Sequence, residues 1–332
     1  MSGLATTVTP GAQRRNQADA ARLADAFQFR GRQKWDLWAL SGLFALVCLW
    51  AWQFYSTWAS WGNLTIDSGH EMYIPALLAE GKTLYTDVWF NFGPAAPYFN
   101  SYLFRLFGVR LEVLYWAGSL SALASSLLLY FSSLELSRPM IGWTAGAVLL
   151  MEAFQPTFFC FPLPYSFSAV YGCVSACLFL YILIRATRSG HWCWIFGLGT
   201  TSAVAFLLKP EFGLACYGTL AIFIGLRRFW PQGSLIRDIC MIVPGVIVCA
   251  AVGWWMVSLR GFQFITQENI QSWPTSYFMQ RYGKFWLKSN GFALDPASLL
   301  AALRRTLFPA GIAFAAYLVA QYKRSPAKSR RL

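Results

Sequence analysis

Apolar stretches of about 20 residues recur along most of the chain and are separated by short polar segments. A helix of that length crosses the hydrocarbon core of a bilayer, where only helices or closed barrels satisfy their backbone groups. The pattern therefore predicts an all-α integral membrane protein, a polytopic bundle of about eight transmembrane helices. By length, the expected spans are 36–58, 110–134, 139–157, 164–184, 191–208, 211–227, 239–259 and 300–321.

Charged residues make up 12% of the chain, far below the share in a soluble domain. The formal net charge of +13 is compatible with nucleic-acid binding, but the basic residues form short clusters between apolar stretches and share no single face. We therefore expect membrane lipids as partners and no nucleic acid. The 8 cysteines include no CxxC pair, so neither a disulfide framework nor a zinc site is indicated.

The positions of lysine and arginine predict which side of the membrane each segment faces. The first 34 residues hold a cluster of arginines, so this arm is expected to stay in the cytoplasm. Alternating spans then place the two long segments, 59–109 and 260–299, on the extracytoplasmic side. The expected location is a bacterial-type inner or plasma membrane, with both termini in the cytoplasm. The predicted organisation is a disordered basic arm at 1–34, a transmembrane domain at 35–321 and a basic tail at 322–332.

The segment 59–109 concentrates ionisable side chains next to the first span. Ser68 and Glu71 have the spacing of a capping box, and Gly81 is typical of a helix terminator. We therefore expect a short interfacial helix there, followed by a second amphipathic helix from Tyr98 to Phe107. The ionisable side chains of this segment include Asp67, His70, Glu71, Lys82 and Asp87.

These side chains have a structural and a functional interpretation. Asp67 and Glu71 suit the positive end of a helix, but titratable groups beside a span also mark functional sites. His70 is expected as a polar interface residue rather than a metal ligand, because the chain has only 2 histidines. Asp87 either caps a turn or takes part in the site. We expect no cofactor: carboxylates can hold a divalent metal, but no motif indicates one.

A second group of charges, Lys209-Pro210-Glu211, lies between two expected spans. Pro210 interrupts the helix, which is tolerated beside protein or a water-filled cavity. The structural interpretation is a lysine that extends to the interface and pairs with Glu211. The functional interpretation is an ammonium group that holds a phosphate. Glu152, inside its expected span, should face a cavity because a carboxylate in lipid is costly.

The segment 260–299 carries the cations Arg281, Lys284 and Lys288 close together. Cations near a membrane surface commonly contact lipid headgroups, and they equally suit a phosphate or diphosphate on a lipid carrier. Both interpretations stay open from the residues alone.

The order of these motifs resembles the GT-C superfamily of integral-membrane glycosyltransferases, in particular bacterial relatives of dolichyl-phosphate-mannose–protein mannosyltransferases and of aminoarabinose transferases. The Lys209-Pro210-Glu211 turn is similar to a segment in some members, and the likeness covers about residues 36–290. It rests on the acidic motif Asp67-Ser68-Gly69-His70-Glu71, the stretch Gly81-Lys82-Thr83-Leu84-Tyr85-Thr86-Asp87, and the pairs Gly93-Pro94 and Phe107-Gly108.

The resemblance implies transfer of a sugar from a polyprenyl-phosphate donor to an acceptor at the extracytoplasmic face. Asp67 would act as general base or position the acceptor, with Glu71 as a second catalytic carboxylate. The donor phosphate would be bound by Lys209, Arg281 and Lys284. Supporting roles would fall to His70, Asp87, Glu152 and Glu211. Neither the sugar nor the acceptor, which is a protein, a lipid or a glycan, is indicated.

Two other classes share some of these features. A lipid-linked sugar transporter or flippase is expected to show charges or broken helices near the bilayer midplane and internal symmetry. A non-catalytic membrane assembly protein, including a truncated relative of the transferases, would show no preference for carboxylates opposite cations on one face. A continuous polar path across the membrane favours transport, and the absence of an outer cavity favours the assembly protein.

Overall fold

The computed structural model describes residues 37–58, 60, 67–136, 139–155, 160–227 and 234–264, and the single residues 296 and 300. The chain separates into two compact units, Met1–Gly261 and Phe262–Leu332, and everything below concerns the first. Within the described ranges this unit is helical, and its one β-bridge joins Leu84 to Val88. The helices are α2 (Leu37–Ser56), α3 (Asp67–Ala79), α4 (Ala95–Phe107), α5 (Leu111–Leu136), α6 (Pro139–Ala153), α7 (Phe167–Ser189), α8 (Trp192–Leu208), α9 (Pro210–Arg227) and α10 (Leu235–Arg260).

The helices α2, α5, α7 and α10 are each long and apolar enough to cross a membrane, and α6 and α8 are shorter apolar helices. The protein is therefore a helical, membrane-embedded protein, as its apolar pattern predicts. The four helices confirm the class but not the expected number of eight spans, and the expected span at 300–321 lies outside the described ranges. The predicted short helices of the segment 59–109 are confirmed as α3 and α4.

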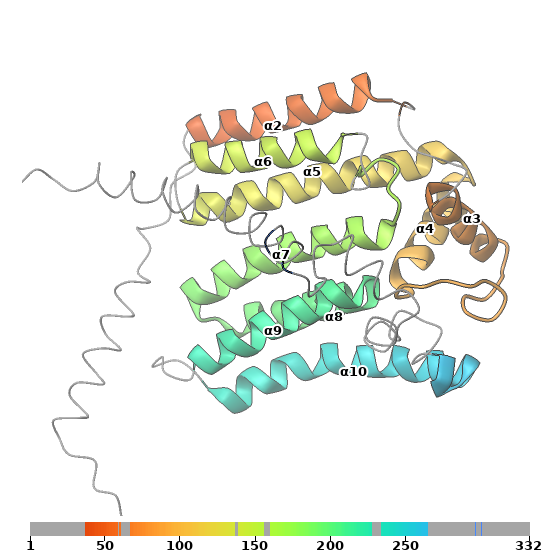
Figure 1. Ribbon diagram of the computed structural model, residues 1–332. Coiled ribbons are helices and arrows are strands. Elements are labelled where there is room, and N and C mark those ends of the chain that lie inside the picture. Colours follow the sequence, from red (N-terminus) through yellow and green to blue (C-terminus); the bar gives the residue numbers. More distant parts are fainter. Residues whose placement is uncertain are drawn as a thin grey trace, which may run out of the picture. The chain divides into compact units, whose positions relative to one another are not determined.

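Small residues let the long helices pack closely. On α6, Gly146 lies against the Ser126 hydroxyl of α5 and the side chain of Leu46 of α2. Polar side chains then bind backbone across the same interfaces: Ser126 donates to the carbonyl of Gly146, and the hydroxyl of Tyr130 donates to that of Ala39 at 2.6 Å. In lipid the hydrophobic effect does not drive helices together, so close packing and hydrogen bonds of this kind stabilise their association. They join α2, α5 and α6, with α7, α8, α9 and α10 following on the other side of α5 (Figure 1).

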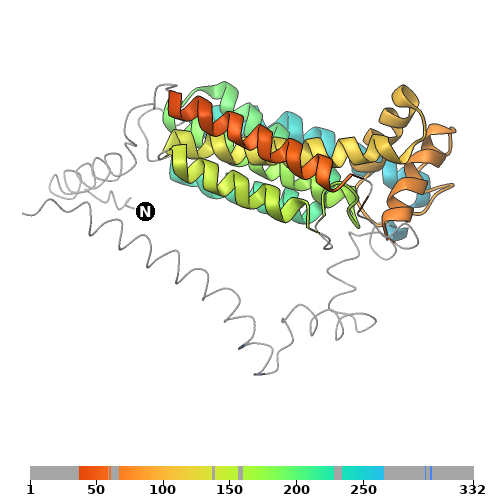
Figure 2. The ribbon, with the colours of Figure 1, turned by 90° about the horizontal axis from the view of Figure 1, so that it is seen from above.

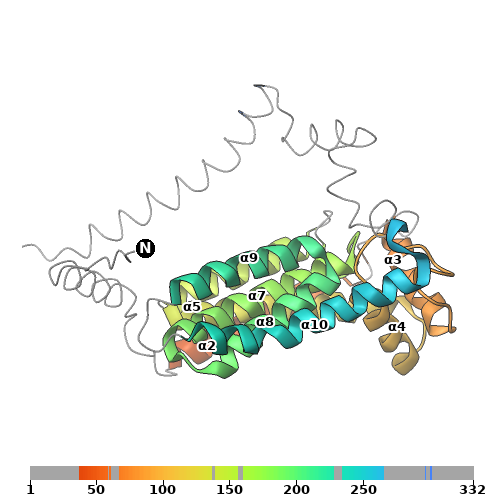
Figure 3. The same cartoon turned by 90° about the horizontal axis from the view of Figure 1, so that it is seen from below.

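The helices α3 and α4 lie beyond one end of the long helices, as the views from above and below show (Figures 2 and 3). They pack on each other, and the guanidinium of Arg105 on α4 donates to the carbonyl of Leu78 near the end of α3 at 2.8 Å. We call this end of the bundle, made of residues 67–110, 160–166 and the α8–α9 turn, the site end. It contains the first acidic motif and the Lys209 turn together.

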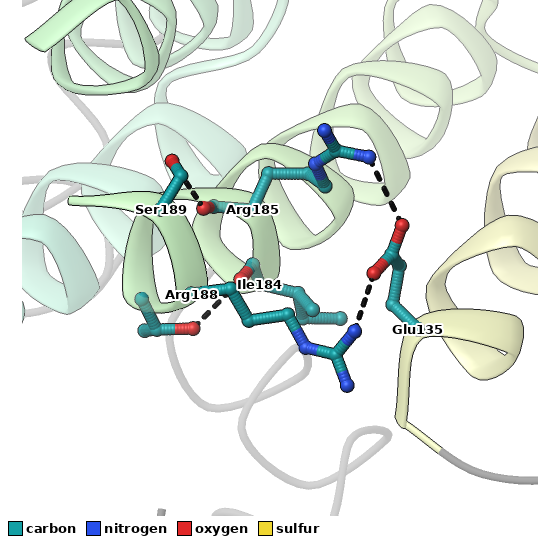
Figure 4. A network of polar contacts seen from close by, with 6 residues as sticks. Glu135, Ile184, Arg185, Arg188 and Ser189 are labelled. Atoms are coloured by element: carbon teal, nitrogen blue, oxygen red, sulfur yellow. Dashed lines mark hydrogen bonds and ion pairs between the residues drawn. The ribbon is translucent and has the colours of Figure 1, made fainter. Parts of the chain in front are cut away.

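The opposite end is closed by ion pairs. Glu135 on α5 binds two arginines of α7 at once, Arg185 at 3.0 Å and Arg188 at 2.6 Å (Figure 4). Arg227 at the end of α9 pairs with Asp238 of α10 at 2.8 Å, and both side chains are almost completely buried. The first group joins α5 to α7 and the second joins α9 to α10, so these pairs hold this end of the bundle together.

Candidate functional site

The first acidic motif fastens α3 to the start of α7. The hydroxyl of Ser68 lies 3.3 Å from the carbonyl oxygens of Leu163 and Pro164. The carboxylate of Glu71 accepts a hydrogen bond from the backbone N–H of Phe167 at 2.9 Å. Ser166, the N-cap residue of α7, makes no side-chain cap of its own. Glu71 therefore supplies from α3 the acceptor and the negative charge that the N-terminus of α7 needs.

This geometry corrects one expectation for the motif. Because α3 begins at Asp67, Ser68 lies inside the first turn and is not the N-cap of that helix. Glu71 is only 4% exposed and accepts a backbone amide, so its carboxylate has a structural role, and its catalytic role stays a prediction. Asp67 starts α3, four positions before Glu71, and its side chain lies outside the described part of the structure.

The loop from residue 80 to 94 is a compact turn that Asp87 and Tyr85 hold. The carboxylate of Asp87 accepts the N–H of Thr83 at 2.8 Å, which confirms the turn-capping interpretation of this residue. Tyr85 has a positive φ of 70° and is buried, and its hydroxyl donates to the carbonyl of Phe92 at 2.6 Å. Burial, and secondarily the nearby Tyr98, raises the pKa of Tyr85 well above its ordinary value.

Gly93 brings this loop against the end of α8. A Cβ at this position would collide with the carbonyl group of Leu207, so only glycine permits the approach. The approach places the ring of Phe92 under the side chain of Lys209. The Gly93-Pro94 pair thus joins the loop 80–94 to the Lys209 turn, a role that its place in the sequence does not reveal.

Lys209 lies at the site end, and its surroundings are aromatic. Its ammonium group donates to the hydroxyl of Tyr165 at 3.2 Å and lies 4.9 Å from the ring centre of Phe92. Among the described residues, no carboxylate oxygen lies within 4.0 Å of it. The expected pair with Glu211 is therefore not formed, since Glu211 is exposed in the first turn of α9. The rings stabilise the cation, and no carboxylate of the described residues neutralises its charge.

The backbone at Lys209 is fully used. Its N–H donates to the carbonyl of Ala205 at 2.9 Å, and its own carbonyl accepts from Phe212 and Gly213. Pro210 occupies the first position of α9, where its missing N–H has no cost. The turn therefore leaves no free carbonyl at this residue, and the lysine side chain rests on a rigid connection.

The remaining predicted site residues are scattered. His70 is exposed and stacks near Phe90, with 6.3 Å between the ring centres. Glu152 is exposed in the last turn of α6, which ends at Ala153 rather than at 157, and it is not among the residues that line the groove described below. Arg281 and Lys284 lie outside the described residues. Within the described part of the chain, no three His, Cys, Asp or Glu side chains are grouped to hold a metal ion.

An apolar groove of about 910 Å³ lies between α4, α5, α7 and α8 and extends to the start of the α8–α9 turn. On α5 its wall runs from Glu112 to Ala124, a length of about 18 Å at 1.5 Å per residue. It reaches Leu208, the residue before Lys209, and Arg110 lies at its rim. The other residues that line the groove are Ala95, Phe99, Leu103, Phe107, Val113, Trp116, Ala117, Leu120, Ser121, Tyr171, Val174, Ser175 and Val204.

Sequence reasoning missed the groove and the aromatic partners of Lys209. Phe92 and Tyr165 come from two loops far apart in the chain and carry no shared spacing, so no sequence pattern connects them. No family model, curated protein or solved structure matches this chain.

Proposed function

We propose that the protein transfers a sugar from a polyprenyl-phosphate donor to an acceptor at the extracytoplasmic face of the membrane, like the glycosyltransferases that its sequence resembles. The observation that carries the proposal is the Lys209 ammonium, which lies between aromatic rings and has no carboxylate within 4.0 Å among the described residues. A cation kept in such a place suits an anionic ligand, and a phosphate is the compact anion that lysine binds best.

The groove supports a donor with a long apolar tail. It extends along α5 and reaches the residue that precedes Lys209. A polyprenyl chain in the groove would leave its phosphate beside the ammonium, so one ligand would use both features. A soluble nucleotide sugar would use neither the length nor the apolar wall of the groove.

In this proposal, Asp67 takes the proton of the acceptor as the acceptor oxygen or nitrogen attacks the anomeric carbon. The bond from that carbon to the phosphate oxygen breaks, and Lys209 stabilises the charge that grows on the leaving phosphate. Arg281 and Lys284 are proposed as further cations for the same phosphate. Glu71 and Asp87 hold the frame, in keeping with their hydrogen bonds.

Binding of the carrier lipid tests the role of Lys209 directly. Undecaprenyl phosphate is added to the purified protein in nanodiscs, and its affinity is measured by native mass spectrometry. We expect Lys209→Gln to weaken binding about tenfold or more, since a hydrogen bond to a charged group contributes about 1.5–3 kcal/mol. Lys82→Gln is the matched control because Lys82 is an exposed lysine of the same end. Equal affinities for the wild type and Lys209→Gln would refute the phosphate site.

Lipid analysis of cells tests the reaction itself. Cells with Asp67→Asn are expected to accumulate a polyprenyl-phosphate sugar and to lack the glycosylated acceptor, while the protein still inserts into the membrane. Normal glycan transfer by this variant would remove Asp67 from the mechanism. Movement of an intact lipid-linked sugar across proteoliposomes, without cleavage of its sugar–phosphate bond, would instead support the transporter alternative.

A further inference from the structure

The turn between α7 and α8, at the end of the bundle opposite the Lys209 site, presents a histidine and a cysteine side by side. Gly190 ends α7 with a φ of 62°, and His191 is the N-cap residue of α8. The carbonyl of Gly190 accepts a hydrogen bond from Arg227 at 2.8 Å, and the N–H of His191 donates to the Ser189 hydroxyl at 3.3 Å. These contacts fix the backbone from which the His191 ring extends.

The Nδ1 atom of His191 lies 2.9 Å from the sulfur of Cys193. The same nitrogen accepts the backbone N–H of Cys193 at 3.3 Å. An N–H only donates, so Nδ1 carries a lone pair and the neutral ring holds its hydrogen on Nε2. In this tautomer the thiol of Cys193 can share the same nitrogen as its acceptor at 2.9 Å, which places a nucleophile beside a group that can serve as its general base.

Cys193 also differs from the other cysteines in its surroundings. Cys160, Cys177 and Cys216 are buried, whereas Cys193 and His191 are both exposed. The exposed Cys48 and Cys240 lie on α2 and α10, two apolar helices that are long enough to span the membrane. Cys193 is the second residue of α8 and lies at the turn itself, outside the apolar middle of the helix.

We propose that Cys193 is a nucleophilic thiol that reacts reversibly with low-molecular-weight disulfides, with His191 as its base. The sulfur attacks one sulfur of the disulfide and its proton passes to Nδ1. The disulfide bond of the small molecule breaks, and its leaving thiolate takes the proton from the imidazolium. Cys193 ends as a mixed disulfide and one small thiol is released, so no other oxidant is needed. The lysine and arginine distribution predicts that this turn faces the cytoplasm, where small thiols and their disulfides are present.

The reaction is tested on the full-length protein with glutathione disulfide at pH 7.0. Its rate at each cysteine is followed by peptide mass spectrometry. Because Nδ1 of His191 can take the thiol proton during the attack, we expect Cys193 to react about tenfold faster than a cysteine without a base. In the wild-type chain unfolded by denaturant, Nδ1 is no longer held at 2.9 Å from the sulfur, and the rate at Cys193 should fall toward that of Cys48 and Cys240.

His191→Asn separates the base from the structural role of the residue. Asparagine is an equally good N-cap, so α8 keeps its cap while the basic nitrogen is lost. We expect the thermal unfolding of this variant to match the wild type and its rate at Cys193 to fall about tenfold. An unchanged rate in His191→Asn, or a rate at Cys193 no higher in the folded than in the unfolded protein, would overturn the proposal.

Discussion

Glu71 on α3 and the backbone N–H of Phe167 on α7 are joined by a hydrogen bond of 2.9 Å, although 96 residues of sequence separate them. The bond lies where the acidic motif was expected to meet substrate. It makes the position of α3, and therefore of Asp67 at its start, depend on the end of a long helix.

The Glu71 bond predicts a difference between two substitutions. Glu71→Ala leaves a buried N–H of α7 without its acceptor, and we expect a loss of about 1–3 kcal/mol in the free energy of unfolding. Glu71→Gln keeps an acceptor oxygen and should lose less. Thermal unfolding in detergent, followed by circular dichroism, measures both. Full stability of Glu71→Ala together with lost transfer would return Glu71 to the catalytic residues.

The hydroxyl of Tyr165 is expected to position the Lys209 ammonium. Tyr165→Phe keeps the ring but removes the acceptor at 3.2 Å from Nζ. A neutral hydrogen bond contributes about 0.5–1.5 kcal/mol, so binding of undecaprenyl phosphate should weaken by about two- to tenfold, less than in Lys209→Gln. Tyr73→Phe removes an exposed hydroxyl from α3 and should leave the affinity unchanged. A Tyr165→Phe protein that binds as tightly as the wild type would contradict this role.

Gly93 is expected to tolerate no side chain. In Gly93→Ala the new methyl group meets the carbonyl of Leu207, and the strain should cost about 1–3 kcal/mol and move Phe92 away from Lys209. We expect a lower unfolding temperature and weaker binding of the carrier lipid. Gly218→Ala adds the same methyl group to α9 in open space and is expected to be neutral or slightly stabilising. Wild-type behaviour of Gly93→Ala would show that the loop does not need this approach.

Tyr85 is expected to make the protein sensitive to alkaline pH. Its pKa is raised in the folded state because burial opposes the charged form, so folding favours the neutral phenol. The stability that this provides is complete below the unfolded pKa of about 10 and decreases as pH rises above it. Denaturant unfolding between pH 9 and 11.5 should therefore show a shallower loss in Tyr85→Phe than in the wild type. Parallel curves for the two proteins would place the titrating group elsewhere.

Much of the fold follows from patterns that the sequence contains. Length and apolar content predict α2, α5, α7 and α10, because the bilayer requires about 20 apolar residues of any spanning helix. Gly81 marks the end of α3 correctly, since a φ of 97° there suits glycine alone. Length and apolar content do not fix where α6 ends. The expected span runs to residue 157, but the helix ends at Ala153, shortly before Pro156, and the residue before a proline disfavours the helical conformation.

The site was less predictable because its partners are chosen by tertiary packing. The spacing of Ser68 and Glu71 indicates a cap within one helix, yet both side chains bind residues nearly 100 positions away, where burial makes each hydrogen bond more valuable. Lys209 could be selected as an unusual cation, but Phe92 and Tyr165 could not be assigned to it. Aromatic residues make up 18% of the chain, so the sequence gives no signal that these two in particular lie beside Lys209.

The tight hairpin of α8 and α9 sets the register between the groove and the cation. Leu208 lines the groove, Lys209 follows it, and Gly213 packs so closely on Phe206 that a Cβ has no space. One residue inserted into α8 just before Leu208 would rotate the helix end by about 100°, so Lys209 would lose its place beside Phe92 and Tyr165. Insertions and deletions should therefore be far less acceptable at this hairpin than in the arm that precedes α2.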